Sequence, residues 1–435
     1  MTDDTAENEE SSQHPPPGIW ATVKYAYDSL VRTVIRPQRS NYTTEDLGPT
    51  TCLLARNLVV GRQDITLRNE KGLAVECSWW RRKIPATETP KKEPCIVVLH
   101  GNSSCRLGCM DILFHGLAAG FTVFALDFSG SGMSEGKYVS LGYHEKRDID
   151  LVLAYLRESN HVSNIVLWGR SMGAVAALLC AQEDHDITAL VLDSPFSCLK
   201  QLALDLVDDG KLNVPKFAVS LVMRVLRRDI KRRAKFDMFK LNPIASMDKC
   251  MAPSFFAVGE QDELVAPKHV ENLHAAHRGP KQLYKFVGGH NSPRPAAFYH
   301  EAINFCRVMC GQLPIPQLPD DDAEDDPVQL VEQSISHEEL SVKSIRELKK
   351  ILNEGGIDNS LLSTIVEKSE LVDLVLTLQE RRLKLALHQR RHSENEDMES
   401  TSLSGLERRY STGSDGISLD NIRPELNDLK PAGVN

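Results

Sequence analysis

The sequence predicts an α/β fold built on a mostly parallel sheet. Between Leu53 and about Gly311, short apolar runs alternate with amphipathic stretches of helical periodicity, the order typical of a sheet covered by helices on both faces. One transition is sharp: in residues 164–181, NIVLWGRSMGAVAALLCA, two apolar runs are joined by a Gly-Arg-Ser-Met-Gly segment. We therefore expect a strand, a tight turn with a serine at its tip, and a helix at this point.

Eight strands are expected, the first of them as an antiparallel, hairpin-like start and the rest as parallel. They are residues 64–68, 74–80, 95–99, 121–127, 165–168, 189–192, 254–258 and 282–287. Helical periodicity favours helices at 144–158, 172–182 and 268–277. Residues 194–250 form a longer insertion with the position of a short helical cap over a pocket. Its basic run, VSLVMRVLRRDIKRRAKF, is interpreted as a solvated helix face or as a contact for an acidic group.

The turn at Ser171 has the pattern Gly-x-Ser-x-Gly between a strand and a helix. This context is typical of the nucleophile elbow of an α/β hydrolase, which lifts the serine hydroxyl clear of the sheet edge. Ser134 lies in a second match, within DFSGSGMSEG. That run leads into polar residues and not into a buried helix, so a loop beside the site is expected there. Ser171 is therefore the candidate nucleophile.

A serine nucleophile needs a base and a carboxylate that orients the base, and in this fold the chain order is serine, acid, histidine. His290 follows the last expected strand in the glycine-rich FVGGHNSPRP, where a loop can carry its side chain over the sheet edge. Asp262 follows strand 254–258, whereas Asp193 is a rival acid whose favoured interpretation is a turn or helix-capping residue. Three further histidines, His269, His274 and His277, belong to an expected helix and are assigned surface or packing roles.

The oxyanion of an acyl-transfer intermediate requires two backbone amide donors. Met172, which follows the candidate nucleophile, is expected to supply one. The loop after CIVVLH is expected to supply the other, with Asn102 as the first choice and Ser103 as the second.

The motifs LHGNSS, DFSGSGMSEG, GRSMGA, LDSPFS, GEQDELV and GGHNSPRP follow in this order. Together with VIRPQRSNY near residue 36, they resemble the serine-aminopeptidase-like α/β-hydrolase family over roughly residues 28–311. The resemblance implies Ser171 as nucleophile, Asp262 as acid, His290 as base, and backbone donors at Asn102 and Met172. The family also resembles esterases, monoacylglycerol lipases and protein depalmitoylases, so fold does not choose the substrate.

Composition bounds the function class. The chain has 435 residues and a net charge of −9, which makes nucleic acid an unlikely partner. Its acidic start shows no secretory signal and no apolar run spans a bilayer, so a cytoplasmic location is expected, with membrane-peripheral association as an alternative. Cys105 and Cys109 lack a second ligand pair, so neither a metal nor a cofactor is expected.

The amino-terminal region divides into a disordered stretch, residues 1–17, and a helix with its following segment, residues 18–52. Apolar residues recur at helical spacing in this helix: Trp20, Val23, Tyr27, Leu30 and Val34. The stripe predicts a helix packed on the hydrolase domain of residues 53–311, or alternatively weak membrane-surface contact through residues 18–36.

Beyond the hydrolase domain, residues 312–334 form an acidic, Pro-rich linker and residues 392–435 a disordered tail. Residues 335–391, with ELKKIL, a Gly-Gly turn and EKSELV, resemble a SAP-type helical hairpin, in particular the carboxyl-terminal domain of the mesencephalic astrocyte-derived neurotrophic factors. Its basic and acidic residues are balanced, which favours a protein partner over nucleic acid. Ser393 and Ser411 each follow paired arginines and are candidate phosphorylation sites.

The sequence thus favours a serine hydrolase acting through an acyl-enzyme on an acyl ester or thioester, with a lipid or an acylated protein as substrate. Peptidase activity is less favoured. The alternative is an interaction protein that retains a hydrolase fold and recruits partners through the helical hairpin and tail.

Overall fold

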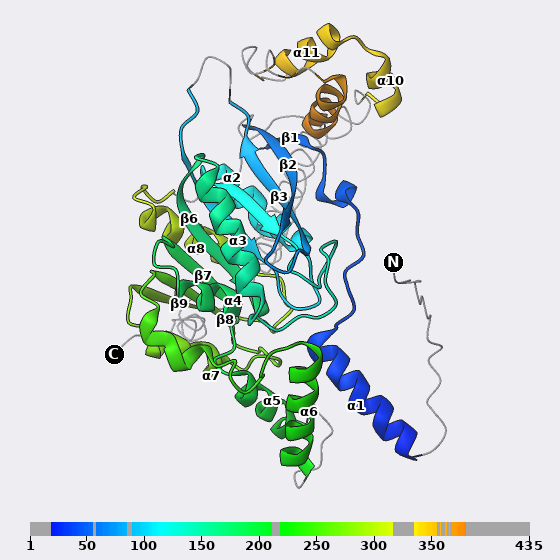
Figure 1. Cartoon of the computed structure of the whole chain (residues 1–435). Helices are drawn as coiled ribbons and strands as arrows, with labels where there is room; N and C mark the ends of the chain where they lie inside the picture. The colour runs from blue at the N-terminus through cyan, green and yellow to red at the C-terminus, as the bar shows by residue number, and fades with distance from the viewer. Residues whose placement is uncertain are drawn as a thin grey trace, which may run out of the picture. The chain divides into compact units, whose positions relative to one another are not determined.

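The computed structural model describes residues 19–54, 58–84, 89–210, 218–315, 335–354, 357, 362, 365 and 367–379. Within them one sheet of nine strands runs in the order β1-β2-β3-β5-β4-β6-β7-β8-β9 (Figure 1). The strands are β1 (Thr51–Leu54), β2 (Leu58–Arg68), β3 (Ala74–Arg82), β4 (Glu93–Leu99), β5 (Thr122–Leu126), β6 (Val162–Arg170), β7 (Ala189–Asp193), β8 (Ser254–Gly259) and β9 (Lys281–Phe286).

The first three strands pair antiparallel with their neighbours and the rest of the sheet is parallel, as the sequence predicts. The expected count of eight strands is one short. β1 has only four residues, too few to show an alternating pattern, and it pairs with a β2 that begins six residues before the predicted start at Asp64. The mostly parallel sheet of an α/β-hydrolase fold is otherwise confirmed.

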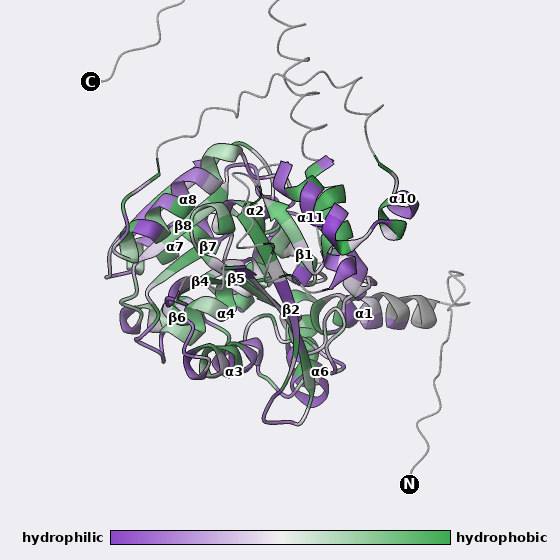
Figure 2. Cartoon of the chain, turned by 90° about the horizontal axis from the view of Figure 1, so that it is seen from above, coloured by the Kyte–Doolittle hydropathy of each residue, from purple (hydrophilic) through white to green (hydrophobic). Residues whose placement is uncertain are grey.

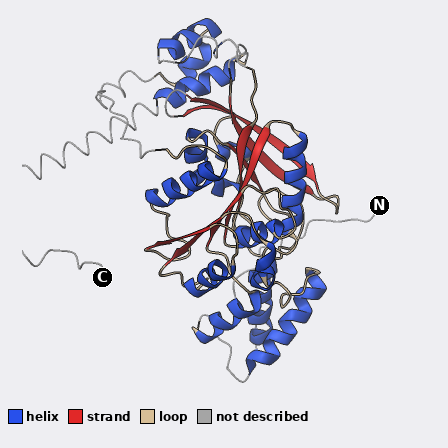
Figure 3. Cartoon of the chain, turned by 90° about the vertical axis from the view of Figure 1, so that its left-hand side faces the viewer, coloured by secondary structure: helices blue, strands red, loops and turns tan. Residues whose placement is uncertain are grey.

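Two apolar layers cover the sheet, because successive residues of each strand point to opposite faces. In β4, Cys95 and Val97 belong to one core cluster, whereas Ile96 and Val98 belong to the other. The first layer is closed by α3 (Glu145–Glu158), α4 (Met172–Ala181) and α7 (Pro267–Ala276), and the second by α2 (Met110–Ala118) and α8 (Ala296–Met309). Figure 3 shows helices on both sides of the sheet, and Figure 2 shows that the apolar residues concentrate between these layers.

The cap contains two helices between β7 and β8, namely α5 (Leu199–Asp208) and α6 (Val219–Arg233). The amino-terminal helix α1 (Ile19–Ile35) lies beside α6 at this end of the molecule (Figure 1). Val31 and Ile35 of α1 are buried in one cluster with Leu226 and Ile230 of α6. This segment therefore has a packing role at the cap.

In the carboxyl-terminal region the structure describes α10 (His337–Val342), α11 (Ile345–Glu354) and a helical segment at 368–379. Leu348, Leu352 and Leu374 are fully buried. Glu370 accepts hydrogen bonds from Lys83 Nζ at 2.9 Å and from Thr51 Oγ1 at 3.0 Å. The helical segment at 368–379 thus makes a polar contact with β1 and with the residue that follows β3.

Several expectations fall outside the described residues. They concern residues 1–17, the linker from residue 316, the tail with Ser393 and Ser411, and the side chains of Trp20 and Val23. Among the helices that the structure describes, none combines the length and apolar character that a membrane span requires.

Candidate active site

The nucleophile elbow is built at the junction of β6 and α4. Ser171 stands between them with φ 51° and ψ −114°, a backbone conformation that residues with side chains seldom adopt. A Cβ atom at Gly173 would lie 2.1 Å from the Leu99 carbonyl oxygen, and one at Gly169 would lie 2.4 Å from the Gly173 carbonyl oxygen. Because both approaches exclude a side chain, the sequence requirement for two glycines follows from the tightness of this turn.

The acid and base expected from the sequence lie together. His290 Nδ1 donates to Asp262 Oδ2 at 2.7 Å, and both side chains are buried. Asp262 follows β8 and His290 follows β9, so two adjacent parallel strands deliver these residues to the same edge of the sheet as Ser171. This bond leaves Nε2 as the ring nitrogen that faces a reacting group.

Asp262 is held as a carboxylate by several donors. Its Oδ1 accepts from the amides of Leu264 at 3.0 Å and Val265 at 2.7 Å. Burial opposes ionisation of this group, but the hydrogen bond and charge of His290 together with the two amides lower the pKa of Asp262 below its ordinary value. The carboxylate can therefore stabilise an imidazolium at His290.

Two arginines hold the main chain of the histidine loop. The His290 carbonyl oxygen accepts from Arg170 Nη2 at 2.9 Å and from Arg294 Nη2 at 3.2 Å. Arg294 also pairs with Asp193 through Nε and Nη2, each at 2.9 Å. The carbonyl oxygen of Asp193 in turn accepts from the Ser171 amide at 2.7 Å. A continuous polar network thus links the nucleophile turn to the base.

Ser171, Met172 and Asn102 line a common cavity of about 190 Å³. Its other walls are almost entirely apolar and come from α1, α5, α6 and the segment after Asp262, with Leu30, Leu202, Val222 and Leu264 among them. No charged side chain lines it among the described residues. An apolar chain attached to a carbonyl at Ser171 would be surrounded by hydrocarbon in this cavity.

The expected oxyanion donors lie at the same place. Met172 is the first residue of α4, so its amide is one of those that a helix leaves without an internal acceptor. Asn102 lines the cavity with it. Ser103, the second choice, has φ 61° and its carbonyl oxygen accepts from Ser40 Oγ. Among the described residues, His290 has hydrogen bonds with Asp262, Arg170 and Arg294 and none with Ser171 Oγ. A bond between nucleophile and base is often long or poorly aligned before substrate binds.

The residues that the sequence presents as rivals have other partners. The Ser134 hydroxyl is fully buried, donates to the Asp127 carbonyl oxygen at 2.6 Å and accepts from the Glu76 amide at 2.8 Å. The Asp193 carboxylate binds Arg294 and caps no helix. The helix-capping alternative is therefore wrong for Asp193, because the next helix has Cys198 at its N-cap and the carboxylate pairs with Arg294, 101 residues away in the sequence. The turn alternative is not contradicted, since Ser194, directly after Asp193, has φ 54°.

The remaining candidates occupy packed positions. His269 and His277 are buried, and His269 Nδ1 lies 2.8 Å from Ser197 Oγ and its Nε2 lies 3.0 Å from Asp205 of the cap helix α5. Cys105 and Cys109 are buried, and burial raises the pKa of both thiols. Among the residues described, no group of three or more His, Cys, Asp or Glu side chains could hold a metal ion.

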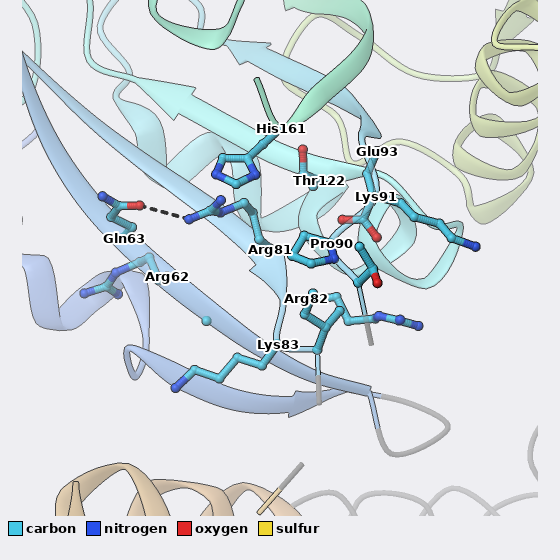
Figure 4. A pocket seen from close by; sticks show the side chains of 13 residues that line it. Arg62, Gln63, Arg81, Arg82, Lys83, Pro90, Lys91, Glu93, Thr122 and His161 are labelled. Carbon is cyan, nitrogen blue, oxygen red and sulfur yellow. Dashed lines mark hydrogen bonds between the residues drawn. The ribbon is translucent and has the colours of Figure 1, made fainter. Parts of the chain in front are cut away.

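A larger cavity, of about 800 Å³, lies at the other edge of the sheet, where β4 and β5 begin (Figure 4). Figure 4 shows Arg81 between Gln63 and His161, and Arg81 Nη2 donates to Gln63 Oε1 at 3.2 Å. None of the sequence-predicted site residues lines this cavity. Ser171, Met172 and Asn102 line the smaller, apolar cavity instead.

Sequence reasoning did not single out Arg170, Arg294 or Thr33 as site residues. Arg170 lies in the motif GRSMGA and Arg294 in GGHNSPRP. For Arg294, the one local indication is a cation four residues after the candidate base. Leu30 and Val34 were part of the amphipathic stripe, but nothing in that pattern indicates that they line the cavity at Ser171.

Comparison with known proteins finds similarity to a family of this fold and to several of its relatives. Residues 90–243 match the family model described as Hydrolase_4: serine aminopeptidase, S33. The uncharacterized protein YqkD of Bacillus subtilis is 30% identical over 201 residues, covering 45% of this chain and 64% of YqkD. The phosphatidylserine lipase ABHD16A of Bos taurus is 24% identical over 251 residues, covering 54% of this chain and 41% of the lipase.

The chain thus spans less than two thirds of the length of either relative. The solved structure of the Pyrococcus furiosus esterase Pf2001 aligns with a TM-score of 0.47 and 20% identity, over 62% of this chain and 98% of the esterase. The family match ends before residue 335, so the resemblance of residues 335–391 to a SAP-type hairpin stays a prediction. The strand order and the family match together show an α/β-hydrolase fold in which residues 90–243 match the Hydrolase_4 model.

Proposed function

We propose that this protein is a serine hydrolase that cleaves acyl esters or thioesters through an acyl-enzyme at Ser171. The observation that carries the proposal is the placement of Ser171, at a strained strand-to-helix turn, in the wall of an apolar cavity. The hydrogen-bonded pair of His290 and Asp262 at the same sheet edge supports it.

In the proposed reaction, His290 Nε2 takes the proton of the Ser171 hydroxyl as the oxygen attacks the substrate carbonyl carbon. Asp262 stabilises the imidazolium that results. The amides of Met172 and Asn102 stabilise the oxyanion, and the imidazolium gives its proton to the departing alcohol or thiol. Water, activated by the same histidine, then attacks the acyl-enzyme and releases the acid, which restores the free serine.

The cavity supports an acyl chain as the part of the substrate that is recognised. Its lining is apolar except for Thr33, Asn102 and Ser171. A peptide in this position would leave its backbone amides without hydrogen-bond partners, at a cost in binding free energy. A lipid substrate also agrees with the similarity to a phosphatidylserine lipase. A fatty acyl ester or acylated protein therefore fits better than a peptide.

Hydrolysis of p-nitrophenyl butyrate by the full chain tests this proposal. We expect Ser171→Ala and His290→Ala to lower kcat/KM by at least about a thousandfold, because the nucleophile and base act as one unit. Asp262→Asn should lose less, since the base is retained but its orientation and counter-charge are not. Ser134→Ala is the matched control; if it abolishes turnover in a folded protein while Ser171→Ala retains it, the nucleophile has been misassigned.

A further inference from the structure

Helix α1 contributes to the cavity at Ser171 although it precedes the whole sheet. Leu30, Thr33 and Val34 of α1 line that cavity together with residues of α5 and α6. The family match begins only at residue 90, so this wall lies outside the part of the chain that the family describes.

The helical period divides the last two turns of α1 between two surfaces. Leu30 and Val34 are four residues apart and line the cavity, whereas Val31 and Ile35 do not line it, are each 1% exposed and lie in a core cluster with Ile230 of α6. Residues on one helix that alternate in this way fix its rotation about its own axis. The side chains of Leu30 and Val34 are thus held against the cavity.

Two polar contacts join α1 to α6 beside this apolar seam. Tyr27 Oη donates to Asp229 Oδ2 at 3.0 Å, and Arg233 Nη2 lies 3.5 Å from Asp28 Oδ1. Burial and the hydrogen bond to Asp229 raise the pKa of Tyr27 to about 12. The carbonyl oxygen of Ile35 accepts from the Val139 amide at 2.9 Å, which anchors the end of the helix.

We infer that α1 is a wall of the acyl-chain site, and that Leu30 and Val34 set the length of the acyl chain that the enzyme accepts. The inference rests on the proposed function and adds a specificity determinant to it. A larger side chain at either position fills volume that the distal methylenes of a long chain need. A short acyl chain needs less of the cavity than a long one, so discrimination between long and short substrates changes.

The experiment compares kcat/KM of the full chain for p-nitrophenyl acetate, octanoate and palmitate. The variant is Val34→Trp, and Ser29→Trp is the matched control because Ser29 is exposed on the same helix and does not line the cavity. We expect Val34→Trp to lower the palmitate-to-acetate ratio of kcat/KM by about tenfold or more, because the loss falls mainly on palmitate. Ser29→Trp should leave the ratio unchanged.

A second variant separates blocking from loss of packing. Val34→Ala removes atoms from the wall and enlarges the site, so it should shift the palmitate-to-acetate ratio in the direction opposite to Val34→Trp. If Val34→Ala and Val34→Trp lose palmitate hydrolysis alike, or if Val34→Trp keeps the wild-type ratio, the inference is overturned while the proposed function stands. If the wild-type chain hydrolyses no ester faster than Ser171→Ala, the proposed function itself fails.

Discussion

Arg294 and Asp193 form a buried, bidentate ion pair next to the main chain of His290. Arg294 Nε and Nη2 donate to the two carboxylate oxygens of Asp193 at 2.9 Å, and Nη2 also reaches the His290 carbonyl oxygen at 3.2 Å. Asp193 ends β7, beside the strand that carries Ser171. The pair therefore connects the strand next to the nucleophile with the loop that carries the base.

This relationship predicts different effects on stability and on catalysis. Arg294→Met leaves the Asp193 carboxylate buried without its partner, so we expect a loss of about 3–5 kcal/mol in the free energy of unfolding. The double variant Arg294→Met/Asp193→Asn removes both charges and should recover most of that loss. Its kcat/KM for a short ester should stay about tenfold or more below wild type, because the His290 carbonyl oxygen still lacks one donor.

Urea denaturation and ester hydrolysis of both variants measure the two quantities. Arg278→Met, at an exposed position, is the control for removal of an arginine charge. Full recovery of turnover in the double variant would mean that the pair acts on folding alone and does not position the base.

The lowered pKa of Asp262 predicts a dependence of stability on pH. A carboxylate whose pKa is depressed in the folded state contributes stability above its ordinary value of 3.8, and this contribution disappears as pH falls through the folded pKa. Asp262→Asn lacks that contribution at every pH. The difference in Tm between wild type and Asp262→Asn should therefore be largest near pH 6 and shrink towards pH 3. Scanning calorimetry over this range checks the sign, and a difference that grows on acidification would contradict it.

The segment after residue 315 is predicted to be dispensable for chemistry. Ile315 is tied to α8 through Asn304, whose side chain accepts from the Ile315 amide at 2.7 Å, and all proposed catalytic residues precede it. A chain ending at Gln317 should keep kcat/KM for p-nitrophenyl butyrate within about threefold of the full chain, because no group that touches the cavity is removed.

The truncated chain also loses the Glu370 contacts with Thr51 and Lys83. A partly exposed ion pair contributes only about 1 kcal/mol or less, so we expect a small decrease in Tm. Circular dichroism confirms that the fragment is folded. A folded fragment without turnover would show that the carboxyl-terminal helices take part in the reaction or that the proposed domain boundary is misplaced.

The elbow could be predicted from the sequence because all of its determinants are local. Two glycines, a serine and two flanking apolar runs lie within 18 residues, and the tight approach of Gly173 to the Leu99 carbonyl oxygen leaves no other residue type. Asp262 and His290 could be proposed because each follows an expected strand, and parallel strands bring their carboxyl ends to one edge. The alternating order of strands and helices also predicted the sheet. The exception is β1, whose four residues are too few to show a pattern.

The rest depends on contacts between distant segments. The partner of Asp193 is set by packing of the histidine loop on β7, which no local pattern records. Likewise, the apolar stripe on α1 indicates that one side of the helix is buried, but it does not indicate which segments cover that side. In the structure, part of it packs against α6 and part of it lines the cavity. Which side chains pair and which residues line a cavity can be determined only when the tertiary structure is known.

Covalent labelling tests directly whether Ser171 is the nucleophile. The full chain is treated with a fluorophosphonate probe, digested, and the modified residue is located by mass spectrometry, in parallel with Ser171→Ala and Ser134→Ala. We expect one probe per chain on Ser171 in the wild type and in Ser134→Ala, and none in Ser171→Ala. Modification of a residue other than Ser171, or a folded wild-type chain that does not react at all, would contradict it.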